Sequence, residues 1–439
     1  MNVNKFFTAA KQAGIDPFEI SYGSSKSLSA GIFNDNLEKY ESSNDCSFTA
    51  RGIYEGKLGS FSSDKVDVSV IDTMIETIKS TAKYGLPGNP EFFIEKGQKY
   101  KKVNTYSKEA DECSGKKLID LSLEISKQIR DYDKRIQIAE VGMDKSVSEG
   151  VLANSKGLKL KSKSSNVVVW ASTKVVDGDD IETDFDFALV TDPNTFDTKE
   201  FSEKLAKKSL SRLGAAPVKS GKYNVVFAQS CVSSLLKPLL GQLSSFSVEQ
   251  HLSLFENKLG QQVFSPKLTV IENPYTKTPF ASSHDREGMP TQKKVLINKG
   301  KVNTYLYDLE MAKKSGTVST GNASYRGGSI RPGLGFVEVK PGKKSFDELV
   351  SLVGNGIYID SLEGIGTGYN TQSGDYSLQA NGYVIENGKV TKPVTLITVA
   401  GNVLKDFSKI IAVGSDVKLM FGAIQTPSIA VRKLSVSGK

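Results

Sequence analysis

The dipeptide Asn387-Gly388 constrains the fold more than any other short segment of this sequence. It lies between the strand-like run Tyr383-Val-Ile385 and a second run rich in β-branched residues. Asn-Gly readily adopts the positive φ angles of a type I′ turn, so the segment predicts a two-residue β-hairpin. Asn298-Lys-Gly300 separates two further strand-like runs in the same way. Many antiparallel strands in about 200 residues predict a large curved sheet or a barrel for the second half.

The first half has a different pattern, in which groups of strands are separated by helices. Apolar residues recur at helical spacing near residues 4–13, 71–82, 116–129 and 199–213. Asn34-Asp35 and Glu55-Gly56 are predicted hairpin turns. Further strands are expected at 135–139, 146–148, 158–161, 167–170 and 184–189. This arrangement is typical of an α+β fold.

A chain of 439 residues is too long for one ordinary hydrophobic core, so two domains are expected. The segment 215–221 contains Pro217 and Gly221 and is the best candidate for a linker. We therefore predict an N-terminal α+β domain of antiparallel strands with helices at 1–214. The second domain, 215–439, is predicted to be mostly antiparallel β, with two short helices near 306–314 and 346–354.

The composition excludes several classes of protein. A hydrophobic fraction of 38% with 24% charged residues is typical of a globular protein and not of a disordered one. The net charge of +8 is spread over scattered lysines, without the basic blocks and interleaved aromatic residues that bind nucleic acid. No segment approaches the ~18 consecutive apolar residues of a membrane span. Neither nucleic acid nor a membrane is therefore an expected partner.

The cysteines and the first residues indicate the compartment. Cys46, Cys113 and Cys231 are too few and too dispersed for a disulfide framework or a cysteine-based zinc site. The segment 1–11 has no apolar stretch of the kind found in secretory signals. A reducing, cytoplasmic location is expected.

Eight short motifs in the second half resemble, in order, those of the TldD/PmbA peptidase family. They are Lys258-Leu-Gly260 with Phe264-Ser-Pro266, Asp285-Arg-Glu-Gly288, Ser319-Thr-Gly-Asn322, Gly374-Asp-Tyr-Ser377, Gly382–Gly388, Pro393–Asn402 and Val413-Gly-Ser-Asp416. Gly56-Lys-Leu-Gly-Ser60 gives a looser likeness in the first half. Each motif alone is weak, but their common order is specific.

The resemblance implies where a metal site would lie. Metal-bearing members of the family read roughly LLHEAVGH, in which two histidines bind zinc and the glutamate is the general base. At those positions this chain has Lys237, Pro238 and Gln242. A lysine ammonium has no lone pair, and a glutamine amide is a poor zinc ligand. The family's additional cysteine ligand is also missing from the corresponding segment 416–428.

Other hydrolytic sites are weakly supported. His251 and His284 are the only histidines, and neither has a partner at metal-ligand spacing. A zinc site built from both, with Asp285 or Glu287, would have acceptable ligand types but no support from spacing. No Gly-x-Ser-x-Gly motif is present. An autonomous hydrolase with an unfamiliar site is the least supported alternative.

The resemblance also implies residues that contact substrate. The loop 319–326 could place backbone N–H groups around an anion, but a tight turn between strands is the favoured explanation of its sequence. The resemblance nevertheless assigns this loop to the family's inter-subunit cleft. On this basis Gly321 and Asn322 are candidate peptide contacts, together with Asp285, Glu287 and Gly288.

Two functions follow as hypotheses. The first is a PmbA/TldE-like, metal-free subunit of a heteromeric zinc peptidase that acts on unfolded or leader-bearing peptides. This chain would form half of the substrate cleft and bind no cofactor, while a TldD-like partner would carry the zinc. The second is a homodimeric peptide-binding or scaffold protein without peptidase activity. In either case we expect a dimer, with a TldD-like subunit or with itself.

We predict that the isolated chain binds no stoichiometric zinc, because Lys237 and Gln242 cannot replace the two histidine ligands. Elemental analysis of chelator-washed protein tests this. About one zinc per chain would contradict the prediction, and His251→Ala and His284→Ala would then locate the site.

Overall fold

The computed structural model describes residues 3–65, 67–326 and 329–439. The chain forms two compact units. Unit 1 comprises Met1–Ser211 and two short segments of the second half, Lys277–Pro279 and Glu287–Pro290. Unit 2 comprises Arg212–Thr276, Phe280–Arg286 and Thr291–Lys439. The sequence-based domains, 1–214 and 215–439, stay a prediction.

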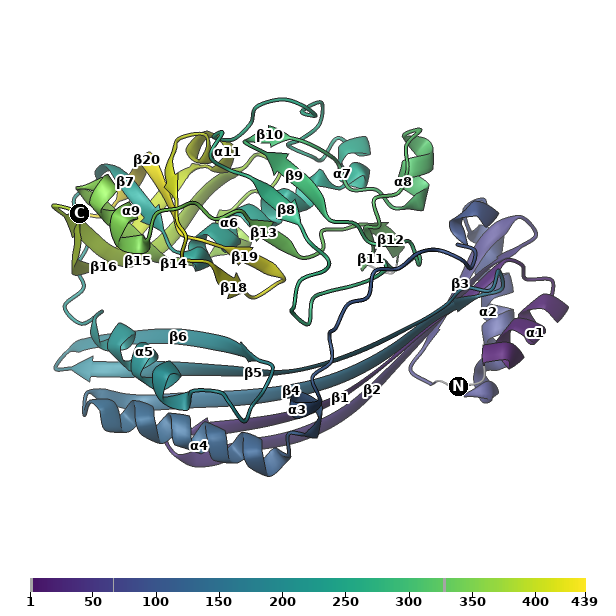
Figure 1. Ribbon diagram of the computed structural model, residues 1–439, viewed down its shortest axis with the longest axis horizontal. Coiled ribbons are helices and arrows are strands. Elements are labelled where there is room, and N and C mark those ends of the chain that lie inside the picture. Colours follow the sequence, from purple (N-terminus) through teal and green to yellow (C-terminus); the bar gives the residue numbers. More distant parts are fainter. Residues whose placement is uncertain (1–2, 66, 327–328) are drawn as a thin grey trace. The chain divides into compact units, whose positions relative to one another are not determined.

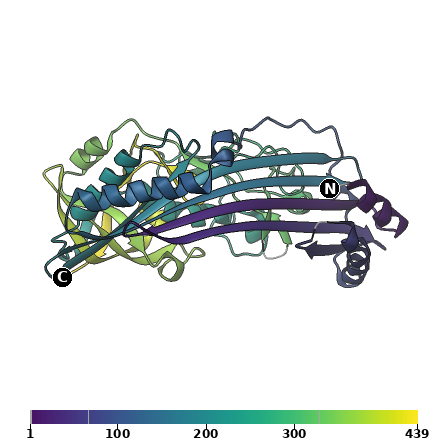
Figure 2. The ribbon, with the colours of Figure 1, turned by 90° about the horizontal axis from the view of Figure 1, so that it is seen from below.

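Unit 1 is built on one antiparallel sheet with the strand order β3-β2-β1-β4-β5-β6. The strands are β1 Phe18–Phe33, β2 Asn36–Tyr54, β3 Lys57–Ser63, β4 Ile136–Asn154, β5 Lys159–Asp177 and β6 Asp180–Val190. Four of them are 16 to 19 residues long, and the sheet curves along its length into a half-barrel (Figure 1). Figure 2 shows these long strands side by side.

Helices cover parts of this sheet. They are α1 Val3–Gln12, η1 Val68–Val70, α2 Ile71–Tyr84, η2 Pro90–Phe92, α3 Lys108–Glu112, α4 Gly115–Tyr132 and α5 Thr198–Leu210. The α4 helix begins where the Ser114 hydroxyl accepts a hydrogen bond from the N–H of Lys117, and it buries Leu118, Ile125 and Ile129. A separate core at the other end of the strands contains Phe6, Phe18, Phe48 and Met74.

Unit 2 contains a closed barrel. Its strands are β7 Gly221–Phe227, β14 Gly356–Glu363, β15 Asp375–Glu386, β16 Lys389–Asn402 and β20 Ile429–Ser437, with β17 Ile410–Val413 paired outside β20. The pairing of β16 with β20, from Thr398↔Ser437 to Ala400↔Ser435, closes the ring of five strands.

A second six-stranded sheet has the order β10-β9-β8-β13-β19-β18. Its strands are β8 Val270–Glu272, β9 Lys294–Asn298, β10 Lys301–Val302, β13 Val337–Val339, β18 Lys418–Met420 and β19 Ile424–Thr426. The strands β11 Ala323–Arg326 and β12 Ser329–Pro332 pair separately.

The helix α6 (Gln229–Leu240) contacts both sheets of unit 2, through β7 and β14 of the barrel and β18 and β19 of the second sheet. The other helical segments are η3 Gly241–Leu243, α7 Ser245–Glu249, α8 Leu309–Lys314, α9 Phe346–Val353, α10 Ile365–Gly368 and α11 Val403–Phe407. The α6 helix spans Gln229–Leu240 and buries Val232, Leu235, Leu236 and Leu239 completely. The polar residues Gln229, Ser233 and Lys237 recur at helical spacing on one face, and most of the buried leucines lie on the remaining faces.

The structure confirms the predicted α+β class and the barrel in the second half. It also confirms the hairpin at Asn387-Gly388, whose φ angles are 52° and 74°. The short strands predicted between 135 and 189 are wrong in length, because they are parts of strands of up to 19 residues. The predicted helix near 306–314 begins only at Leu309, where the side chain of Asp308 caps it.

Among the described residues, no helix combines the length and the apolar character that crossing a lipid bilayer requires.

The barrel yields a prediction about Gly382, which pairs with Ile359 at an irregularity between β14 and β15. A Cβ atom at 382 would overlap the carbonyl oxygen of Tyr358, so Gly382→Ala should lower the free energy of unfolding by about 1–3 kcal/mol. The matched control is Gly241→Ala, where a Cβ atom meets no other atom within 4 Å. Gly241→Ala should leave the free energy of unfolding unchanged or raise it by up to ~1 kcal/mol. Urea denaturation followed by circular dichroism measures both, and equal effects would contradict the argument.

Candidate functional site

The last turn of α6 carries the residues that the resemblance assigns to the metal site. Lys237 and Pro238 lie in this turn, and Gln242 follows in η3. Pro238 lies inside the helix, two residues from its end, and has no N–H to donate to the carbonyl of Ser234. The Oε1 atom of Gln242 is buried without a hydrogen-bond partner among the described residues. The backbone oxygen of Gln242 accepts a hydrogen bond of 2.5 Å from the Ser253 hydroxyl.

The same turn meets the segment that lacks the family's cysteine. The Nζ atom of Lys237 lies close to where a Cβ atom at position 422 would be, so a larger residue there would require the lysine side chain to move. Gly422 has a φ angle of 86° and lies in the turn between β18 and β19. The two stretches that the resemblance assigns to one metal site are therefore adjacent in this structure. The ammonium of Lys237 lies where they meet.

Asp416 fixes this segment to the start of α6. The Nε2 atom of Gln229 donates to the backbone oxygen of Asp416 at 2.7 Å and to its Oδ2 at 2.8 Å. The same carboxylate accepts bonds from the N–H of Ser428 at 3.1 Å and from its hydroxyl at 2.7 Å. The geometry around Lys237 is thus held by hydrogen bonds at both ends of the segment.

The structure does not bring the histidines together in a metal site. His251 is 79% exposed, has a φ angle of 55°, and its Nδ1 lies 2.7 Å from Oε1 of Glu256. His284 contacts the Ser283 hydroxyl at 3.0 Å, and burial, followed by the nearby charge of Arg286, lowers its pKa. Within the residues that the structure describes, no group of three or more His, Cys, Asp and Glu side chains could hold a metal ion.

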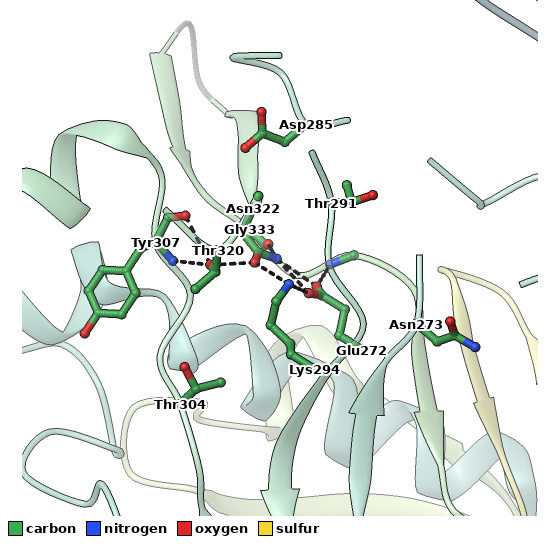
Figure 3. Close-up of polar contacts among 12 residues, drawn as sticks. Glu272, Asn273, Asp285, Thr291, Lys294, Thr304, Tyr307, Thr320, Asn322 and Gly333 are labelled. Carbon is green, nitrogen blue, oxygen red and sulfur yellow. Dashed lines mark hydrogen bonds and ion pairs between the residues drawn. The ribbon is translucent and has the colours of Figure 1, made fainter. Parts of the chain in front are cut away.

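Asn322, a predicted peptide contact, lies in a buried polar network (Figure 3). It is 5% exposed, and its Nδ2 donates to both carboxylate oxygens of Glu272, at 2.8 and 3.0 Å, and to the backbone oxygen of Gly333. Its Oδ1 accepts bonds from Lys294 Nζ at 2.9 Å and from the Thr320 hydroxyl at 2.7 Å. Both polar atoms of the amide are used within the protein.

Glu272 is the centre of this network, and the sequence analysis did not single it out. It is 2% exposed and forms an ion pair with Lys294, whose side chain is 12% exposed. The N–H of Gly335 donates to its Oε1 at 2.6 Å. The available signal was an acidic residue directly after the apolar run Val270-Ile271, since a buried carboxylate requires charged or polar partners. The partners are distant in sequence, so spacing could not identify them.

The remaining predicted contacts fall into two groups. Asp285, 9% exposed, accepts a hydrogen bond from the N–H of Ala323 at 2.9 Å, so it lies beside the Asn322 network. Gly321 belongs to the same loop and has a φ angle of 69°. Glu287 and Gly288 belong instead to unit 1. The backbone oxygen of Gly288 accepts a bond of 2.8 Å from the Tyr100 hydroxyl. Peptide contact by these residues stays a prediction.

Three family models cover most of the chain. The PmbA/TldA metallopeptidase C-terminal domain matches residues 220–438, the central domain matches 108–213, and domain 1 matches 18–83. The chain belongs to the TldD/PmbA family.

Individual relatives are similar over nearly their whole length. The Metalloprotease PmbA homolog of Buchnera aphidicola subsp. Acyrthosiphon pisum is 27% identical, over 94% of this chain and 91% of that protein. Metalloprotease PmbA of Escherichia coli O157:H7 is 24% identical, over 97% and 93%. A crystal structure described as a putative modulator of a DNA gyrase, from Thermotoga maritima, has a TM-score of 0.91 at 28% identity and covers 99% of both chains. TldE from Thermococcus kodakarensis has the same fold, with a TM-score of 0.88 at 24% identity and 99% coverage of both chains.

The buried network leads to a prediction of stability. Glu272→Gln leaves the Lys294 ammonium in a largely buried position without its counter-charge, and should cost about 3–5 kcal/mol of unfolding free energy. The control is Glu310→Gln on α8, which removes partly exposed pairs with Lys314 and Arg331 and should cost less than ~1 kcal/mol. Chemical denaturation of both variants makes the comparison. Equal losses would mean that Glu272 and Lys294 are not energetically coupled.

Proposed function

We propose that this chain is a PmbA/TldE-type, non-catalytic subunit of a heteromeric zinc peptidase. The observation that carries the proposal is the position of Lys237, whose ammonium lies against Gly422 at the meeting point of α6 and the segment 416–428. Membership of the TldD/PmbA family gives the chain a peptidase-like fold. The residues at the family's metal position do not fit zinc.

The chemistry of these residues is the reason. A protonated lysine repels a divalent cation and offers it no lone pair. The carboxamide of Gln242 is a weak ligand, and Pro238 has no group that could accept a proton from water. Zinc and the general base of the peptidase reaction would therefore be supplied by a TldD-like partner, and this chain would supply part of the wall of the substrate cleft.

The proposed substrates are unfolded or leader-bearing peptides. Strand addition to a sheet edge holds a peptide through its main chain, which gives low sequence selectivity and requires an extended substrate. Folded proteins, whose main-chain groups are already paired, would be excluded.

Reconstitution with a family member from the same organism that carries HExxxH tests the proposal. We expect the two chains to co-purify as a dimer, with zinc in the partner only, and the pair to cleave an unfolded protein that neither chain cleaves alone. An interface well above ~1,600 Å² is expected for an obligate complex. Replacing the partner's two metal-binding histidines by alanine should abolish cleavage without separating the chains. Lys237→Ala should leave cleavage within about twofold, since in this proposal Lys237 supplies neither the zinc nor the general base.

Two results would contradict the proposal. Chelator-sensitive cleavage by this chain alone would make it a catalytic subunit. A stable homodimer that excludes the HExxxH partner and still binds unfolded peptide would establish the peptide-binding or scaffold function instead.

A further inference from the structure

The β2 strand has one edge that is open over nine residues. β3 pairs with Phe48–Tyr54 only, whereas β1 pairs with β2 along its whole length. The register between β1 and β2 shifts at Glu38, because Gly31 pairs with Lys39 and Ile32 with Leu37. The regular open edge is therefore Lys39–Ser47, all exposed except half-buried Cys46, at the margin of the sheet (Figure 2). At ~3.4 Å per residue it is about 30 Å long.

At the opposite edge of the same sheet, formed by β6, side chains already bond to main-chain N–H groups. On β6, the N–H groups of Phe185 and Phe187 donate to the carboxylates of the preceding residues, Asp184 and Asp186, at 2.8 and 2.9 Å. Lys208 and Lys204 of α5 form ion pairs with Asp184 and Asp186, respectively. These bonds occupy main-chain donors that another strand would need. In Lys39–Ser47, among the described residues, no side chain makes such a bond to the outer main-chain groups.

A cavity of about 270 Å³ adjoins the open edge. Its lining includes Ser42 and Asn44 of the edge itself, and Lys26, Leu28, Lys145 and Val147 of the two neighbouring strands. Residues Ser42 and Asn44 are two apart on one strand, so they lie on the same face of the sheet. A strand added to β2 would present every second side chain to this face, beside the cavity.

The charges around the cavity indicate which kind of peptide side chain would bind in it. The Nζ atom of Lys145 donates to the backbone oxygens of Asp111 and Cys113, at 2.6 and 2.8 Å. The carboxylate of Asp111 accepts bonds from Tyr106 and Lys163. Lys26 has no hydrogen bond or ion pair to any described residue, and its ammonium is the charge left for a ligand. An acidic side chain complements it.

We propose that the Lys39–Ser47 edge binds an extended peptide segment by strand addition, with an acidic side chain of that peptide reaching the cavity toward Lys26. A second copy of β2 fits less well. Antiparallel pairing about Ser43, the middle of the open edge, would set Glu41 opposite Asp45 of the copy, and like charges directly opposite each other destabilise a sheet. This surface belongs to unit 1, whereas α6 belongs to unit 2, so the proposal does not depend on the proposed peptidase function.

Fluorescence anisotropy with labelled peptides tests the proposal on the full chain. The probes are ten-residue, unstructured Ser/Thr/Val peptides with a central Glu, Gln or Lys. We expect the Glu peptide to bind about fivefold more tightly than the Lys peptide. Lys26→Gln should reduce that ratio to near one, whereas Lys127→Gln, at an exposed lysine of α4, should leave it unchanged.

Backbone methylation of the Glu peptide tests the binding mode. N-methylation of one alternating set of residues should abolish binding, because those N–H groups face β2, while methylation of the other set should have little effect. Equal binding of both methylated peptides would overturn strand addition. A Glu/Lys ratio unaffected by Lys26→Gln would overturn the role of the cavity. Peptide affinity that falls as the protein forms dimers would assign the edge to a second copy instead.

Discussion

The burial of α6 between the two sheets of unit 2 determines what the candidate site can be. The helix contacts β7 and β14 of the barrel on one side and β18 and β19 on the other, and its leucines are fully buried. A helix held on both sides cannot turn or slide without opening the core, since packed interiors have few voids. The backbone of Lys237 is therefore fixed, and its ammonium lies beside Gly422.

The fold could be predicted where the sequence contains local signals. Asn387-Gly388 specifies its hairpin because few other dipeptides accept two positive φ angles, and α4 follows from the spacing of Leu118, Leu121, Ile125 and Ile129. The long strands could not be predicted. Residues 36–47 of β2 are mostly polar, and their few apolar residues, Leu37, Tyr40 and Cys46, do not alternate with polar ones. The strand conformation of this segment therefore depends on pairing with β1. The resemblance identified the α6 positions, but spacing could not reveal that Glu272, Lys294 and Asn322 form one cluster.

That cluster also changes how the predicted peptide contacts are understood. The amide of Asn322 has both of its polar atoms engaged by Glu272, Lys294 and Thr320, so a peptide could bind its side chain only at the cost of a buried bond. The motif Ser319-Thr-Gly-Asn322 is explained by structure: the asparagine joins a loop to β8 and β9, and Gly321 provides the left-handed turn before it. A structural role of this kind is enough to account for the motif.

The closure of the barrel has a consequence for synthesis of the chain on the ribosome. β7, near residue 221, pairs with β14 and with β20, and β20 also pairs with β16. The barrel therefore cannot form until residue 437 has emerged from the ribosome. Until then, the apolar surfaces of β7 and α6 stay exposed to solvent. The sheet of unit 1 is complete by residue 190 and can fold while translation continues. During this interval the uncovered apolar surfaces of β7 and α6 are places where a chaperone would act.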